Sequence, residues 1–262
     1  MVNIVVAVKH VSGSADETVF EDDLTIDRTG SDGHLSELDE YAVEQALVLK
    51  DHLGDGATVT ALTVGPAGAS DALAKALQMG ADDAVHVCDD AIAGSDALGT
   101  AVVLAAAIGR LQHDVVVFGI ASTDGWMGVI PSMVSELLEL PVLSRASEVT
   151  VAGQTVRVRR DDDTESRVLE ADMPLLVSVT DQSGEPRYPS FKGIMAAKKK
   201  PVLTWSLPDL GVDDALVGAQ GSCVAVMEVT TRPPRGKGVL VTDESGSGAA
   251  ELVDFLSTHK FV

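Results

Sequence analysis

The stretch DVVVFGIASTDGWMGVIPSMVSELL, residues 114–138, decides the fold class, because a strand, a glycine-rich turn and a helix follow one another in it. Its apolar start, Asp114–Phe118, is typical of a strand that is buried on both faces of a parallel sheet. The segment Gly119–Gly128 reads as a loop, and apolar residues at helical spacing predict a helix over Ile130–Leu138. This order is half of a βαβ unit.

The same order recurs on both sides of this stretch. Apolar runs predict strands over 2–8, 58–64 and 84–88, and helices are predicted over 37–53, 71–79 and 95–111. Ser36 stands at the N-cap position of the helix over 37–53, with Asp39 in place of the capping-box glutamate. The alternation predicts an α/β protein with a doubly wound, mainly parallel, Rossmann-like sheet.

The chain changes character after Pro141. Shorter strands are predicted over 148–151, 156–160 and 167–170, followed by a buried strand over 175–179. From Gly184 onward the sequence predicts an irregular, Pro- and Gly-rich path that ends in a helix over about 249–256. We therefore expect a nucleotide-binding α/β domain over 1–190 and a C-terminal arm over 191–262, which packs on a partner chain or folds back on its own domain.

Composition excludes several classes of partner. The formal net charge of −21 repels nucleic acid and anionic membranes. The acidity favours a solvated, halophile-like surface over an acidic docking surface, because the acidic residues are scattered along the chain and lysine is scarce. We find neither a membrane-spanning apolar run nor a signal peptide, and Cys88 and Cys223 are the only cysteines. These features predict a cytoplasmic protein.

Three predicted strand ends form a candidate ligand site. In open α/β sheets, ligands bind beyond the carboxyl ends of strands, near helix N-termini. These ends carry Ala7 and Lys9, then Val64 and Gly65, and then the loop after Gly119. In that loop Gly125 and Gly128 let backbone N–H groups approach a phosphate, Ser122 and Thr123 add hydroxyls, and Asp124 is placed to accept from a ribose or to cap the turn. A purely structural glycine turn is the alternative.

Catalytic and metal motifs are missing from the sequence. It contains no P-loop, no G-x-G-x-x-G after the first strand, no H-E-x-x-H and no G-x-S-x-G. We therefore predict no catalytic residue and no metal site.

A basic segment stands out in this acidic chain. Lys192, Lys198, Lys199 and Lys200 are four of the nine lysines, and Tyr188 and Phe191 lie just before them. One apolar anchor with a cationic rim is the pattern expected for docking an acidic partner. A phenylalanine buried in its own core is the alternative.

Several segments, in order and over essentially the whole chain, resemble beta subunits of electron-transfer flavoproteins. The most specific is EPRYPSFKGIMAAKKKP (185–201). The others are VAVKHV (6–11), LSELDEYAVEQALVLKD (35–51), VGPAGASDALAKALQMGADDAVHV (64–87) and STDGWMGVIPSMVSELLELP (122–141).

The resemblance implies a heterodimer and a set of ligands. An alpha subunit would hold most of the redox FAD, while this subunit would bind a structural AMP, cover the flavin and perform no bond-making catalysis. Electrons would come from acyl-CoA or other dehydrogenases and pass to a membrane quinone oxidoreductase, as in fatty acid oxidation.

The resemblance also assigns residues. The AMP would lie against Ala7, Lys9, Ser36, Val64, Gly65, Gly119, Ser122, Thr123, Asp124, Gly125, Met127, Gly128, Val129 and Ile130, with its phosphate on the N–H groups of the last three. Phe191 would be the apolar anchor of a recognition loop for the dehydrogenase. The docking set would be Tyr188, Pro189, Phe191, Lys192, Ile194, Met195, Lys198, Lys199 and Lys200.

The sequence departs from the family pattern at a few positions. Ser36 stands where many members have asparagine, Val129 where glutamine is common, and Trp126 where a small or polar residue is usual. The stretch Arg160–Glu170 lacks the paired glycines of the family signature. Two alternatives stay open: a bifurcating subunit that binds a second FAD instead of AMP, and a stand-alone adenine-nucleotide-binding module.

Overall fold

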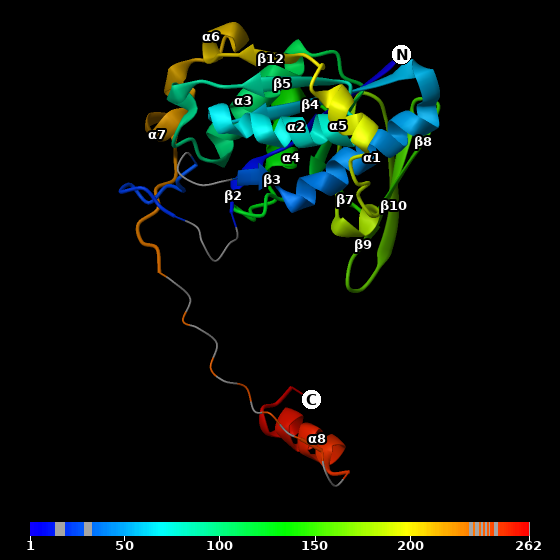
Figure 1. The fold of residues 1–262 in the computed structure, drawn as a ribbon, viewed down its shortest axis with the longest axis vertical. Coiled ribbons are helices and arrows are strands. Elements are labelled where there is room, and N and C mark those ends of the chain that lie inside the picture. Colours follow the sequence, from blue (N-terminus) through cyan, green and yellow to red (C-terminus); the bar gives the residue numbers. More distant parts are fainter. Residues whose placement is uncertain are drawn as a thin grey trace. The chain divides into compact units, whose positions relative to one another are not determined.

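A computed structural model of the chain describes residues 1–13, 19–28, 33–230, 233, 236, 238, 240, 242–243 and 246–261 (Figure 1). The chain divides into two compact units, Met1–Met227 and Glu228–Val262. The first unit carries every predicted site residue and extends beyond the boundary near residue 190 suggested by the sequence.

A seven-stranded parallel sheet forms the centre of the first unit. Its strand order is β12-β5-β4-β1-β6-β11-β7, and every neighbouring pair is parallel. The strands are β1 (Val2–Ala7), β4 (Ala57–Val64), β5 (Asp83–Val87), β6 (Val115–Gly119), β7 (Val142–Ala146), β11 (Leu175–Val179) and β12 (Val202–Trp205). The chain runs outward from β1 through β4 to β5 and then crosses to β6 on the other side of β1, which confirms the predicted doubly wound fold. On that side β11 inserts between β6 and β7, and β12 returns to the first side beyond β5.

Helices cover both faces of this sheet. Ile4, Val6 and Val8 face a core shared with α1 (Glu37–Leu53) and α2 (Ser70–Met79). Val5 and Ala7 face a second core shared with α3 (Ala97–Arg110) and α4 (Ile130–Leu138). The period of two along β1 therefore supplies both cores, as expected for a strand that is apolar at every position.

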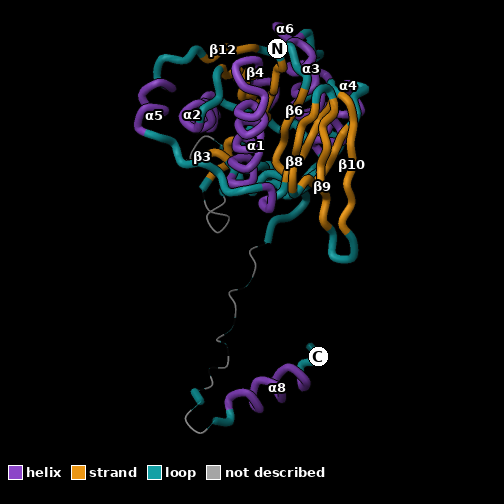
Figure 2. The backbone as a smooth tube through the Cα atoms, turned by 90° about the vertical axis from the view of Figure 1, so that its right-hand side faces the viewer, coloured by secondary structure: helices purple, strands orange, loops and turns teal. Residues whose placement is uncertain are grey.

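Two antiparallel sheets accompany the main one. β8 (Glu148–Ala152), β9 (Thr155–Asp161) and β10 (Ser166–Asp172) form a three-stranded sheet, in which β9 and β10 make a long hairpin (Figure 2). The alternate residues Val149, Val151, Val156 and Val158 turn inward onto the core that contains α1. β2 (His10–Ser12) pairs with β3 (Gly33–Leu35) just before α1.

The predicted irregular path after Gly184 is wrong for residues 191–221. α5 (Phe191–Ala197) packs on α2, and β12 adds an edge strand to β5. The single-turn helices α6 (Leu207–Leu210) and α7 (Gly218–Gly221) follow. These elements are too short to show a periodic pattern, so only pairing with the existing sheet and helices defines them.

The remaining elements are brief. Single 3₁₀ turns occur at Gly54–Gly56, Ala67–Ala69, Asp90–Ile92, Asp181–Ser183 and Asp214–Leu216. The second unit contains α8 (Gly248–Thr258), close to the predicted final helix, with Leu252, Val253 and Phe255 exposed within that unit. Its packing on a partner chain stays a prediction. Among the described residues, no helix combines the length and apolarity that crossing a membrane requires.

Candidate functional site

The predicted nucleotide residues meet at the carboxyl ends of the central strands, which we call the carboxyl edge of the main sheet. β1, β4 and β6 are adjacent, and their carboxyl ends carry Lys9, Gly65 and the loop after Gly119. The chain reverses its direction of growth between β1 and β6, so this edge contains the topological switch point at which open α/β sheets bind ligands.

An ion network fixes the loop after β6. Asp124 pairs with Lys9 (Nζ–Oδ1 2.8 Å) and with Arg28 (NH1–Oδ2 3.0 Å). Its own turn adds the Gly125 N–H, 2.6 Å from Asp124 Oδ1, and Lys9 Nζ also lies 3.3 Å from Ser122 Oγ. Arg28 is not predictable from the sequence, because nothing in its local pattern distinguishes it from a solvated arginine.

The network sets the charge states of its members. Partial burial alone would raise the pKa of Asp124, but the charge and hydrogen bond of Lys9, helped by Ser122 and Arg28, hold that pKa well below its usual range. Burial and the neighbouring Arg28 lower the pKa of Lys9, while Asp124 opposes this effect. Lys9 and Arg28 therefore both face the single carboxylate of this loop.

Backbone donors of the same loop remain available. The Trp126 N–H donates to Ser122 O (3.0 Å) and the Met133 N–H to Val129 O (3.0 Å). Within the described chain, the N–H groups of Gly128, Val129 and Ile130 have no hydrogen-bond acceptor. Gly128 has a φ of 63°, and a Cβ there would lie 3.2 Å from Ile120 O, so glycine suits this turn. Unpaired N–H groups at a helix N-terminus attract anions.

Ser36 stands at the N-cap position of α1, as predicted, but its side chain does not cap the helix. No side-chain cap bond forms at this helix end; instead the buried Ser36 Oγ accepts from the Thr123 N–H (3.3 Å). Asp39 likewise makes no capping box, because its Oδ2 accepts from the Lys9 N–H at 2.9 Å. Both side chains point toward the switch point and tie α1 to the ends of β1 and β6.

Asp39 was missed as a site residue. It is buried beneath Gly119, where a Cβ would lie 2.4 Å from Asp39 Oδ1. Burial raises the pKa of Asp39 to about 7, against the lowering effects of the Lys9 N–H and the Lys9 charge. Gly119 is therefore needed for the close approach of α1 to β6, and only the tertiary contact shows why.

The other predicted contacts lie around this centre. Ala7 and the Val64–Gly65 step end neighbouring strands, and the Gly65 carbonyl is 3.0 Å from His86 Nε2. Trp126 and Met127 are exposed on the loop, whereas Val129 and Ile130 are half-buried.

The predicted docking residues form a second, separate group. Tyr188 is 88% exposed and Phe191 is 82% exposed, so Phe191 is not part of the described core. Met195 is also exposed on α5, and Pro189 and Ile194 are half-buried. Lys192, Lys198 and Lys199 are exposed. Lys200 differs, because its Nζ donates to the carbonyl of Ala81.

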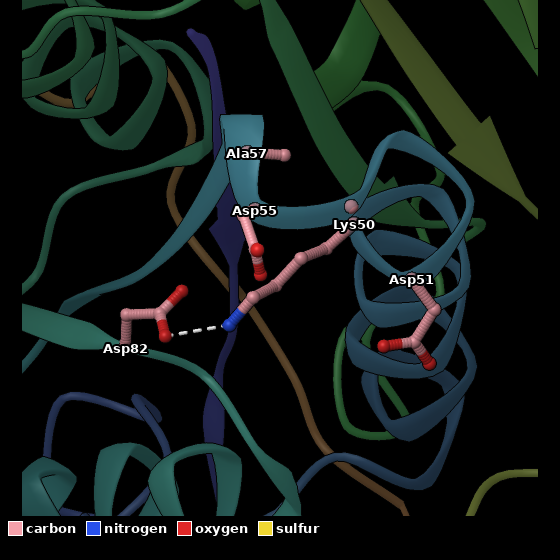
Figure 3. Close-up of a pocket in the computed structure, with 6 residues that line it drawn as sticks. Lys50, Asp51, Asp55, Ala57 and Asp82 are labelled. Atoms are coloured by element: carbon pink, nitrogen blue, oxygen red, sulfur yellow. Dashed lines mark hydrogen bonds and ion pairs between the residues drawn. The ribbon is translucent and has the colours of Figure 1, made fainter.

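A pocket lies at the opposite edge of the sheet (Figure 3). It is lined by Lys50, Asp51, Gly54, Asp55, Ala57 and Asp82, at the amino ends of β4 and β5. β4 has eight residues, so this pocket is roughly 25 Å from Gly65. Lys50 pairs with Asp82 at 2.6 Å, and Asp82 also accepts from the Val59 N–H at 2.8 Å. Lys50 and Asp82 of this pocket are thus already paired within the protein.

In the part of the chain that is described, no cluster of His, Cys, Asp or Glu is arranged to hold a metal ion.

By fold, the chain is a doubly wound, Rossmann-like α/β protein with its candidate site at the switch point. A family model described as electron transfer flavoprotein domain matches residues 23–210. The chain is 41% identical over 267 residues to the electron transfer flavoprotein subunit beta of Mycobacterium tuberculosis, with all of both chains covered. It is 34% identical over 260 residues to the subunit of the same name in Clostridium acetobutylicum, covering 99% of this chain and 100% of the relative.

A third relative carries a different name. The caffeyl-CoA reductase-Etf complex subunit CarD of Acetobacterium woodii is 30% identical over 240 residues, with 91% of each chain covered. The chain therefore belongs to the electron transfer flavoprotein family, and the relatives that it matches over essentially its whole length are beta subunits.

Proposed function

We propose that this chain binds AMP at the switch point, helps to enclose the FAD of an alpha subunit, and docks dehydrogenases through Phe191. As a beta subunit it would be an electron-carrier component without bond-making catalysis. We place the complex in the cytoplasm, where it would pass electrons from acyl-CoA or other dehydrogenases toward a quinone oxidoreductase. The FAD, held mainly by the alpha subunit, would carry those electrons.

The observation that carries the AMP proposal is that the N–H groups of Gly128, Val129 and Ile130 have no acceptor among the residues that the structure describes. They begin a helix, so the backbone dipole favours a phosphate. Asp124 of the same loop pairs with Lys9 and Arg28, and the charges of these two side chains would add to that attraction. Gly128 keeps this approach free of a side chain. The residues present therefore fit an adenylate phosphate, and AMP would serve as a structural ligand there.

The docking proposal rests on the solvent exposure of the Phe191 side chain. A large aromatic side chain that is 82% exposed on a folded unit costs free energy of hydration unless a partner covers it. Three exposed lysines, Lys192, Lys198 and Lys199, follow it within eight residues in a chain of net charge −21. That local contrast favours an acidic partner surface and a salt-dependent association rate.

A second candidate ligand is FAD in place of AMP. The similarity to the subunit of the caffeyl-CoA reductase-Etf complex favours keeping this alternative, although the relatives with higher identity are named electron transfer flavoprotein subunit beta. The unpaired N–H groups would accept a phosphate of either nucleotide.

Nucleotide analysis of the purified heterodimer tests both candidates. Coexpression with an alpha subunit, followed by acid release and chromatography, is expected to yield about one AMP and one FAD per heterodimer. Two FAD and no AMP would replace the AMP proposal with the bifurcating one. Lys9→Ala is expected to lower AMP retention about tenfold, since a charge-assisted phosphate contact is lost. Lys75→Ala is the matched control, because Lys75 pairs with Glu40 on the helical face.

Phe191→Ala tests docking. The variant is expected to weaken the apparent affinity for a reduced acyl-CoA dehydrogenase at least tenfold while the bound flavin is retained. Leu98→Ala on α3, another exposed apolar residue, serves as the control. Unchanged stopped-flow kinetics for Phe191→Ala would remove the docking role.

A further inference from the structure

The segment that carries the predicted docking residues is fixed at its start by one arginine. Arg187, directly before Tyr188, reaches Glu44 in the middle of α1. Its Nε lies 2.8 Å from Glu44 Oε2, its NH2 3.0 Å from Glu44 Oε1, and its backbone N–H 2.9 Å from Glu44 Oε2. The same NH2 lies 3.0 Å from Asp51 Oδ2, further along α1. Residues 143 positions apart in the chain are thus joined by a forked, charge-assisted contact.

Glu44 is committed to this contact. It is only 7% exposed, and both of its carboxylate oxygens accept from Arg187. A carboxylate at such a depth is tolerated when it is paired and fully hydrogen-bonded. The hydrogen bonds from Arg187 to Glu44 also raise the pKa of Arg187, so its charge is permanent. Next to it on α1, Gln45 Nε2 donates to Ser183 O at 2.6 Å and fixes the chain four residues earlier.

The end of the segment is fixed by α5. Ser190 Oγ accepts from the Gly193 N–H (3.0 Å) and caps this helix. Gly193 lies so close to α2 that a Cβ there would be 2.6 Å from Gln78 O. α5 and α2 lie side by side in both views (Figures 1 and 2). Between Arg187 and Ser190 only Tyr188 and Pro189 remain, and proline restricts its own φ.

We propose that Arg187, Glu44 and Asp51 form a positioning clamp that presents Tyr188 and Phe191 to the dehydrogenase in a fixed conformation. The inference rests on the proposed docking function. A surface that is ordered before binding avoids the entropy cost of ordering at the moment of contact, which raises affinity without adding a contact. Arg187 acts through the segment and is a positioning residue, whereas Phe191 would touch the partner.

The clamp and the lysine rim should differ in their response to salt. Glu44 and Arg187 are joined by short hydrogen bonds and Glu44 is buried, so salt screens this pair weakly. Lys192, Lys198 and Lys199 are exposed, so their attraction for a partner falls as salt rises. Loss of the clamp is therefore expected to weaken docking equally at low and high salt.

Three variants and a control test the clamp in the full heterodimer. Arg187→Ala removes the fork and leaves the buried Glu44 carboxylate without its cation, with only the backbone N–H of residue 187 as a donor, which endangers folding. The double variant Arg187→Ala/Glu44→Ala removes both partners and avoids that problem. Arg187→Lys keeps the charge without the planar fork. The control is Arg167→Ala on β10, which breaks an exposed ion pair with Glu165 just before this strand.

Hydrogen exchange measures the clamp directly. Amides of residues 185–198 are expected to exchange about tenfold faster or more in the double variant and less so in Arg187→Lys, with no change in Arg167→Ala. Stopped-flow reduction by an acyl-CoA dehydrogenase and its substrate should show an apparent donor affinity weakened about tenfold. The limiting rate at saturating donor and the reduction by dithionite should be unchanged, because the flavin is not touched.

The outcomes separate the clamp from the docking function. Unchanged exchange in the double variant overturns the clamp, whatever the kinetics show. Faster exchange with unchanged donor affinity overturns the positioning role. If Phe191→Ala also leaves donor affinity unchanged, the docking function itself fails. Adding Phe191→Ala to the double variant should give little further loss, because both changes act on one surface.

Discussion

A lysine–aspartate pair lies at the amino ends of the strands of the main sheet (the amino edge) and another lies at their carboxyl ends (the carboxyl edge), but the two pairs have different roles. At the amino edge Lys50 and Asp82 meet at 2.6 Å, and Asp82 also accepts from the Val59 N–H of the neighbouring strand. At the carboxyl edge Lys9 and Asp124 meet at 2.8 Å, but Asp124 belongs to a loop in which the N–H groups of Gly128, Val129 and Ile130 find no acceptor in the described part of the chain. The first pair stabilises the amino ends of the strands, and the second holds the loop of the candidate site.

The difference lies in where the backbone donors point. Parallel strands end with their carbonyls at the carboxyl edge, and each following helix begins there with free N–H groups. At the amino edge helices end, so arriving strands bring N–H groups that a nearby carboxylate can accept, as Asp82 does for Val59. Similar side chains therefore stabilise one edge and leave binding capacity at the other.

The largest effect on stability is expected from Asp82→Ala at the amino edge. It leaves the N–H of the fully buried Val59 without its side-chain acceptor and Lys50 without its partner. The free energy of unfolding should fall by about 2–3 kcal/mol. Chemical denaturation measures it, and AMP content should remain as in the unmodified heterodimer. Loss of AMP at full stability would mean that the two edges are not functionally distinct.

The next largest effect is a pH-dependent change of stability at the carboxyl edge, from Asp39→Asn. The pKa of Asp39 is raised to about 7, so its contribution to stability is complete below the unfolded pKa of about 4 and is lost as pH rises toward 7. The asparagine variant should match the unmodified protein near pH 4 and exceed it by about 2 kcal/mol at pH 8. Thermal unfolding at several pH values checks this difference, and a constant gap across pH would contradict the assignment to Asp39.

Asp124→Ala should separate binding from stability. The variant frees Lys9 and Arg28 and loosens the loop, so AMP affinity is expected to fall about tenfold. The free energy of unfolding should fall less than in Asp82→Ala, because the N–H that loses its acceptor belongs to the exposed Gly125 rather than to a strand of the sheet. Calorimetric titration of AMP into the nucleotide-stripped heterodimer measures the affinity. Asp82→Ala is the matched control, with the opposite pattern expected.

The smallest effect is expected from Ser36→Ala. Its Oγ accepts one long bond of 3.3 Å and caps no helix, so the cost should be about 0.5 kcal/mol. Asp96→Ala provides the comparison, because Asp96 Oδ1 does cap α3 by accepting from the Gly99 N–H at 2.9 Å. Its loss should cost about 1 kcal/mol or more. Equal costs in denaturation experiments would show that Ser36 caps α1 in solution.

Much of the fold followed from local pattern. The apolar runs at 2–8 and 114–118 and the helical spacing at 37–53 and 130–138 predicted elements that the structure has within one or two residues. β12 and α5 were missed because four and seven residues hold no readable period, and they exist through pairing with β5 and packing on α2. β7 was missed for the same reason.

The candidate site was predictable in part. Strand ends and glycines pointed to Lys9, Gly65 and the loop after Gly119, and the structure brings these to one edge. Arg28, Asp39 and Arg187 could not be found this way. Each is defined by a partner far along the chain: Asp124 for Arg28, Gly119 for Asp39 and Glu44 for Arg187.

By itself, the sequence determined the class of this protein. Periodicity and turn residues are local properties, so the alternation of strands and helices, the switch-point loop and the family likeness can all be read along the chain. Only the tertiary structure decided which charges are used up and which remain, with Asp82 consumed at one edge and the N–H groups of Gly128, Val129 and Ile130 left at the other. Hydrogen bonds between distant residues leave no trace in local sequence, because a side chain has the same chemistry whether or not the fold brings it a partner.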